Sequence, residues 1–197
     1  MSANVWFEEV DRGLLAEIRN SVKYLDADGT VVPIREDMVT VRDPESEFTD
    51  EVFPCITFTN ISDMFNPMRY HFGDVKVDEV VETNQAIMEK TAVPYDLTYQ
   101  IDFWARYRED INLMTRTWLV NHARQFNLPV VDDGGNERTC NVLVKEGLKE
   151  SNLLSGQKRL YHSIVSYTIW VELDDEVRYN TNMVTDRTYD ISKEEGE

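Results

Sequence analysis

The residues that could do chemistry are few and scattered along the sequence. The three histidines, His71, His122 and His162, are isolated from one another, and no HExxH, CxxC or GxSxG motif is present. We interpret these histidines as ordinary surface or half-buried side chains rather than metal ligands. Gly134-Gly135 lies between expected strands, without the strand, turn and helix of a phosphate-binding loop. The sequence therefore predicts no metal site and no cofactor.

Acidic residues are plentiful, but their spacing does not suit a catalytic pair. Asp96 and Asp102 share the polar face of an expected strand, which separates them by roughly 20 Å. A glycosidase-like pair needs about 5 to 10 Å. Asp174-Asp175-Glu176 is better interpreted as a solvated strand end than as a cation site. Because no nucleophile stands near a base, we predict no catalytic residue and no enzymatic activity.

The two cysteines, Cys55 and Cys140, lie in apolar or alternating stretches, FPCITF and RTCNVLV. Neither has a histidine or a cluster of positive charge nearby, as a reactive thiol requires. Two cysteines also fall short of a disulfide framework. We interpret both as small buried hydrophobes.

Two helices are expected to position these residues, as part of an α+β fold with a mainly antiparallel sheet. Residues 5–25 predict the first helix, because Val10, Leu14 and Ile18 recur at helical spacing. The DADG sequence at 26–29 ends it in a turn. Residues 109–125 predict the second helix, which ends before Pro129.

The rest of the chain predicts strands. Expected strands cover residues 38–42, 53–61, 75–81, 84–90, 95–105, 139–145 and 160–173. Residues 95–105 alternate strictly between apolar and polar side chains, so one face is buried. We expect 95–105 and 160–173 to be central strands under the first helix, 84–105 to form a hairpin, and 62–72 to form a loop.

Composition and charge limit the classes to which the protein can belong. The 197 residues carry 20 Lys and Arg against 37 Asp and Glu, a net charge of −17. That charge argues against binding nucleic acid through phosphates or binding anionic membranes. We expect one α+β domain over residues 1–175 and an acidic, partly mobile extension over 176–197. No secretory leader or apolar span is apparent, so a cytoplasmic site of synthesis is expected.

Several large side chains fall outside the expected core and suggest an interface with another subunit or partner. Aromatic residues, Met and Arg are favoured at such interfaces. The candidate interface residues are Phe65, Met68, Arg69, Tyr70, Trp104 and Trp170. We expect Arg69 to pair with a carboxylate of the next subunit, with Glu36, Asp37 or the acids at 45–51 as candidates.

Two segments resemble a known family. EVFPCITFTNISDMFNPMRY (51–70) and TAVPYDLTYQIDFWARYREDINLMTRTWL (91–119) resemble the neck and tail-terminator proteins of tailed bacteriophages, also called tail-completion or head–tail joining proteins. The matching positions include Arg69-Tyr70 and Pro94-Tyr95-Asp96-Leu97. The resemblance extends over about residues 4–175.

The resemblance implies a structural virion protein without catalysis, located in the tail or neck and assembled in the host cytoplasm. Its α+β, tail-terminator-like subunits form a homo-oligomeric ring, commonly a hexamer, at the head-proximal end of the tail. The implied partners are a second copy, the tail tube, the head connector and the sheath. DNA passes through such a ring without being specifically bound, which fits an acidic chain.

Two other classes stay open. An acidic DNA mimic would occupy a basic groove, but the charge here gathers at the chain ends, with a net of −8 over residues 1–52. A small hydrolase or metal-dependent enzyme would need ligand or triad spacing, which the sequence lacks. The oligomeric state separates a ring former from a small mimic.

Overall fold

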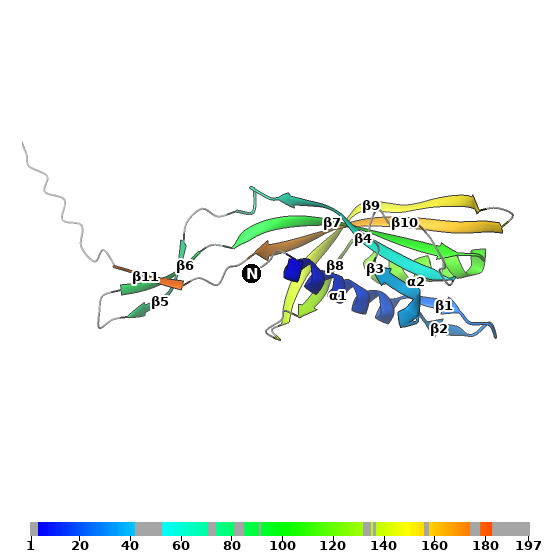
Figure 1. The fold of residues 1–197 in the computed structure, drawn as a ribbon, viewed down its shortest axis with the longest axis horizontal. Helices are drawn as coiled ribbons and strands as arrows, with labels where there is room; N and C mark the ends of the chain where they lie inside the picture. Colours follow the sequence, from blue (N-terminus) through cyan, green and yellow to red (C-terminus); the bar gives the residue numbers. More distant parts are fainter. Residues whose placement is uncertain are drawn as a thin grey trace, which may run out of the picture. The chain divides into compact units, whose positions relative to one another are not determined.

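The computed structural model describes residues 4–41, 53–70, 74–80, 85–90, 92–131, 135, 137–155, 158–173 and 178–182 (Figure 1). By their contacts the residues cluster into a larger unit, Met1–Asn66 with Tyr95–Val171, and a smaller unit, Pro67–Pro94 with Glu172–Glu197. This division differs from the single domain over 1–175 that we expected. The smaller unit combines a segment inserted between two strands of the larger unit with the C-terminal part of the chain.

The larger unit contains both helices and a six-stranded sheet. Its elements are α1 (Asn4–Ser21), β1 (Lys23–Leu25), β2 (Val31–Pro33), a short 3-10 helix (Glu36–Met38), β3 (Val39–Val41), β4 (Cys55–Phe65), β7 (Val93–Ala105), α2 (Arg108–His122), β8 (Gln125–Val131), β9 (Glu137–Ser155) and β10 (Lys158–Leu173). The strand order is β3-β4-β7-β10-β9-β8. The prediction that 95–105 and 160–173 are central strands is therefore confirmed, and so is the α+β class.

Pairing within this sheet is mainly antiparallel. β4 runs antiparallel to β7, and β9 runs antiparallel to both β8 and β10. β3 is parallel to its neighbour, opposite residues Ile56–Phe58 of β4. In Figure 1 the yellow and orange strands β9 and β10 form a long hairpin.

Both helices pack on the same face of the sheet. The α1 side chains Val10, Leu14 and Ile18 are buried, as their spacing predicted. The hydroxyl of Tyr99 on β7 donates to Asp11 of α1, and this residue belongs to the face that also carries Phe103. The opposite face of β7, which carries Asp102, has no helix on it among the described residues. We call this the helix-free face.

The end of α1 differs from the prediction. The helix ends at Ser21, and Lys23–Leu25 form β1, which pairs with β2. The predicted turn at 26–29 connects these two strands, and Gly29 has a φ of 74°, a conformation that favours glycine. Val22 still buries its side chain in the core. The apolar spacing was right about burial, but it extended the helix one turn too far because Val22 stays buried after the helix has ended.

The smaller unit contains a three-stranded sheet. β5 (Asp74–Val80) and β11 (Arg178–Asn182) flank β6 (Gln85–Lys90), and both pairs are antiparallel. The predicted hairpin over 84–105 is therefore wrong, because β6 pairs with β5 and β11 while β7 pairs with β4 in the larger unit. Part of the expected C-terminal extension forms β11, and the rest lies outside the described residues.

Three further expectations need correction. The loop predicted over 62–72 begins later, since β4 continues to Phe65 against β7. The segment after α2 forms β8, although it contains Pro129. An edge strand tolerates proline because one side of its backbone has no strand to bond. The strand expected at 139–145 is longer and spans Glu137–Ser155.

Candidate functional site

A paired histidine lies on the helix-free face of the sheet. His162 on β10 and Asp102 on β7 meet through a hydrogen bond of 2.7 Å between Nε2 and Oδ1. Both residues are buried. The side-chain amide of Gln100 donates to both Asp102 oxygens, at 3.1 and 3.0 Å. The carboxylate is thus held from two sides, which fixes the orientation of the imidazole.

Trp104 completes this cluster. Its ring stacks on the His162 ring with centroids 3.6 Å apart and an interplanar angle of 4°. The indole N–H donates to the hydroxyl of Thr57 on β4 at 3.2 Å. Side chains from three neighbouring strands therefore form one contact chain across the sheet.

A carboxylate that orients an imidazole is a component of general-base sites. A hydrolytic site also needs a nucleophile at hydrogen-bond distance from that imidazole. Among the described residues, no hydroxyl or thiol is hydrogen-bonded to His162. The cluster thus gives geometric support for a structural link between β7 and β10, and none for a catalytic triad.

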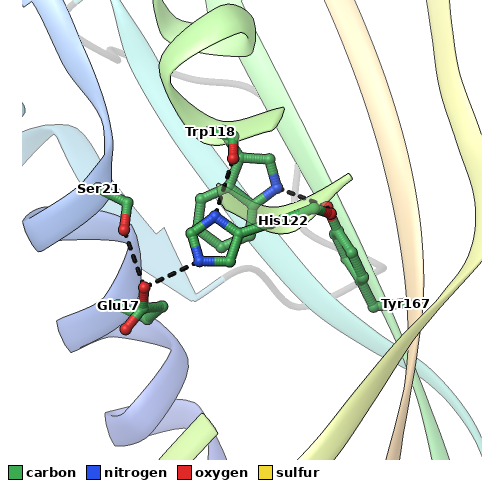
Figure 2. A network of polar contacts seen from close by, with 5 residues as sticks. All are labelled: Glu17, Ser21, Trp118, His122 and Tyr167. Atoms are coloured by element: carbon green, nitrogen blue, oxygen red, sulfur yellow. Dashed lines mark hydrogen bonds and ion pairs between the residues drawn. The ribbon is translucent and has the colours of Figure 1, made fainter. Parts of the chain in front are cut away.

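A second paired histidine lies on the helix-covered side (Figure 2). The Nδ1–H of His122 donates to the Trp118 carbonyl at 2.8 Å, which turns Nε2 toward Glu17 Oε1 at 2.9 Å. The Ser21 hydroxyl donates to the same carboxylate oxygen. The network connects α2 to α1, as Figure 2 shows.

The same network reaches the sheet. The indole N–H of Trp118 donates to the hydroxyl of Tyr167 at 2.7 Å, and that hydroxyl donates to the His122 carbonyl at 2.9 Å. The ring of Trp118 stacks on that of His122 at 3.9 Å. All three residues are buried, and burial raises the pKa of Tyr167, so its hydroxyl keeps the proton that it donates.

Both described histidines therefore follow one pattern, in which an imidazole stacks on tryptophan and pairs with a carboxylate. His122 and His162 are buried, not at the surface or half-buried as expected, while His71 lies outside the described residues. In each case the sequence contained a local indication of the histidine cluster. Trp118 and His122 are four residues apart on one helix, and Asp102 and Trp104 share one strand face. The partners Glu17 and His162 come from distant segments, so only the tertiary fold brings them in.

Another titratable pair joins α1 to the sheet. The Tyr99 hydroxyl donates to Asp11 Oδ1 at 2.8 Å. Burial raises the pKa of the Asp11 carboxyl, the Tyr99 hydrogen bond lowers it in part, and Glu8 raises it further. Burial, together with the Asp11 charge, raises the pKa of Tyr99. The pair stabilises the helix–sheet contact best when the Tyr99 hydroxyl keeps its proton.

The candidate interface residues belong to both units, with Phe65, Trp104 and Trp170 in the larger unit and Met68, Arg69 and Tyr70 in the smaller one. Phe65 is exposed at the end of β4, with its ring 6.1 Å from that of Tyr95. Met68 is 95% exposed. Arg69, Tyr70 and Trp170 are half-buried. The outermost of these positions keep large apolar surface available to a partner.

Trp104 does not fit the expected interface role. It is only 7% exposed and its ring is covered by His162. The candidate carboxylates for Arg69 also have partners of their own, since Glu36 pairs with Arg19 at 2.9 Å and Asp37 with Arg35 at 3.2 Å. The acids at 45–51 lie outside the described residues.

Exposed apolar side chains gather along one edge of the six-stranded sheet. We call Val41, Ile61, Met64 and Phe65 the edge strip. Their exposed fractions are 48, 50, 68 and 41%. Val41 ends β3 and the others belong to the second half of β4. The sequence pointed to apolar side chains in 62–72, Phe65 among them, but it predicted a loop there and so assigned them to no strand edge.

Other site chemistry is limited in the part of the chain that the structure describes. No group of three or more His, Cys, Asp or Glu side chains there is arranged to hold a metal ion. Cys55 is buried, Cys140 is half-buried, and the two do not form a disulfide. None of the described helices is long and apolar enough to cross a membrane.

Comparison with known proteins adds no relative, since no family model and no curated protein matches the chain. The fold and the site alone define its class, an α+β protein with helices on one face of its main sheet. Among the described residues of the larger unit, the edge strip is one place where large apolar side chains are exposed.

Proposed function

We propose that the chain is a structural virion protein that forms a ring at the head-proximal end of a bacteriophage tail, as a tail terminator or neck protein. The observation that carries this proposal is the edge strip, four exposed apolar side chains on β3 and β4 at one edge of the six-stranded sheet. A monomer with such a surface is prone to associate. The phage assignment comes from the resemblance of segments 51–70 and 91–119.

The proposed partners are a second copy of the chain, the tail tube, the head connector and the sheath. Exposed Met68 and half-buried Arg69 and Tyr70 follow the strip in the chain and offer apolar and cationic groups to such partners. The net charge of −17 also suits a ring through which DNA moves without being gripped. The function proposed for the chain is assembly, not catalysis.

The test is assembly with the double variant Phe65→Ser, Arg69→Glu. Electron microscopy of the purified wild-type chain is expected to show closed rings, and the variant is expected to fold normally by circular dichroism without forming them. Phage that carry the variant should release filled heads and separate tails. Normal phage assembly with the variant would contradict the proposal. A monomer that binds basic proteins would favour the acidic DNA mimic instead.

A further inference from the structure

Among the residues that the structure describes, β4 has no neighbour on its outer edge beyond its pairing with β3. β3 covers Ile56–Phe58 only, and β7 occupies the other side of β4 along its whole length. Within the described residues, no strand pairs with the outer edge of Ile61–Met64. An open strand edge presents backbone N–H and C=O groups at which another strand can add.

The side chains beside this open edge are apolar and nearly uncharged. Ile61, Met64 and Phe65 are exposed there, and so is Val41 at the end of β3, which is paired with Phe58 of β4. Asp63 is the single charged residue between Ile61 and Phe65, and its carboxylate accepts a hydrogen bond from the Asn60 amide at 2.8 Å. Neither the charges nor the side chains of this stretch oppose the approach of another strand.

A second strand edge in the same sheet, on β9, carries charged side chains. β9 continues past the end of β8, and its residues there include Lys145, Glu146, Lys149 and Glu150, all exposed. Lys149 and Glu146 form an ion pair. Charged side chains are a common way to prevent a strand edge from pairing with other chains. The contrast indicates that the β4 edge differs from an ordinary protected edge.

Charge also indicates which partner fits the edge strip. A basic protein would be attracted to the acidic surfaces of a chain that carries −17, and it would gain nothing electrostatic from a neutral strip. Two copies of the chain repel each other at most surfaces, because like charges face each other there. An uncharged apolar strip is the surface at which two such copies can touch.

We propose that the edge strip docks a second copy of this chain, with a strand of that copy added to β4 at Ile61–Met64. This inference rests on the self-assembly in the proposed function and adds where and how the copies meet. The added strand would bond the open backbone edge, while its apolar side chains would cover Met64 and Ile61. The pairing of β4 with β7 has a register break between Asn60 and Ser62, and such bulges increase the local twist of a strand.

The first test compares two matched charge substitutions by sedimentation velocity of the full chain. Met64→Glu puts a charge into the strip, whereas Val120→Glu makes the same change at a 74% exposed position on α2. We expect Met64→Glu to weaken self-association by at least about tenfold, and Val120→Glu to leave it near the wild-type value. Circular dichroism checks that both variants fold, and Ile61→Ser provides a second strip variant without a new charge.

The second test follows the backbone by hydrogen exchange. Amides within Ile61–Met64 should exchange more slowly in the assembled wild-type chain than in Met64→Glu. The amides of the strand that the other copy adds should be protected in the same way. Equal self-association of wild type and Met64→Glu, or unchanged exchange at β4, would overturn this inference. The copies in the ring would then have to meet through a different surface. A wild-type chain that is monomeric yet joins phage tails would also overturn it, whereas failure of the tail test would reject the function itself.

Discussion

At the scale of residues, the structure pairs several buried or half-buried polar side chains. Asp102 with His162, and Glu17 with His122, are examples from the two sides of the sheet. A buried carboxylate without a partner is strongly destabilising, so these pairs connect elements that the apolar core alone would hold less specifically. Their residue types were visible in the sequence. Their pairing was not, because 60 residues separate Asp102 from His162.

The Asp11–Tyr99 pair gives a prediction about pH. Because burial raises the pKa of Asp11 above its ordinary value of 3.8, the folded chain holds this proton to higher pH than the unfolded chain does. Its contribution to the free energy of unfolding is therefore full below about pH 4 and declines as pH rises through the raised pKa. Asp11→Asn keeps an acceptor for Tyr99 and removes this decline.

We expect Asp11→Asn to be as stable as wild type, or more stable by about 1 kcal/mol or less, at neutral pH, since Asp11 is only half-buried. Urea unfolding from pH 4 to pH 8 measures this. The control is Tyr99→Phe, which leaves the carboxylate without its donor and should cost about 1 to 3 kcal/mol. Lower stability of Asp11→Asn at every pH would show that the charged carboxylate stabilises the fold.

At the scale of elements, period and alternation predicted most of the larger unit. The helix stripe through Val10, Leu14 and Ile18 and the alternating strand 95–105 were identified by side-chain burial, which the sequence encodes locally. The errors concern the places where the pairing partner of a strand decides which sheet it joins and how far it extends. β6 joined β5 and β11 instead of β7, and residues 62–65 extended β4, because strand pairing depends on distant segments.

The candidate site was less predictable for the same reason. Phe65 and Met68 were found from residue type alone, and both are exposed. The edge strip could not be predicted without the parallel pairing of β3 with β4, because that pairing places Val41 beside β4. The interface role of Trp104 failed because its stacking partner, His162, comes from β10. The whole fold determines which side chains stay exposed, and a single segment of the sequence does not.

The contact of α1 with β8 gives a prediction about packing. A Cβ atom at Gly13 would lie 2.9 Å from the Pro129 carbonyl oxygen and 3.3 Å from a Val130 methyl carbon. Alanine in a helix gains about 1 kcal/mol over glycine from propensity alone. Since the clash involves backbone, the close contact should outweigh this gain, and we expect Gly13→Ala to lose about 1 to 3 kcal/mol of stability.

Thermal unfolding measures this loss, with Gly147→Ala on β9 as the matched control. A Cβ there meets nothing within 4 Å, so this substitution should change stability by less than about 1 kcal/mol. If Gly13→Ala proves as stable as wild type, α1 and β8 can separate without loss, and the helix is not fixed by this contact.

At the scale of the whole molecule, the net charge of −17 opposes any assembly of identical copies. An oligomer of this chain must therefore gain enough from its interface to offset the repulsion between its subunits. Apolar burial is the term that salt does not screen, and the edge strip supplies it in the larger unit. The two acidic ends of the chain contribute most of the repulsion, with net charges of −8 over residues 1–52 and −5 over 174–197.

This balance predicts how self-association depends on salt. Screening lengths shorten from about 10 Å at 0.1 M to about 3 Å at 1 M ionic strength, which removes repulsion between exposed carboxylates and leaves apolar contacts intact. Self-association of the wild-type chain should therefore strengthen as NaCl rises from about 0.05 M to about 0.5 M, by about tenfold or more. Sedimentation velocity across a concentration series at each salt measures the dissociation constant. The Met64→Glu chain should stay weaker than wild type at every salt, because its charge lies inside the contact. Weaker association at high salt would mean that ion pairs hold the copies together, and a neutral edge strip could not then be their interface.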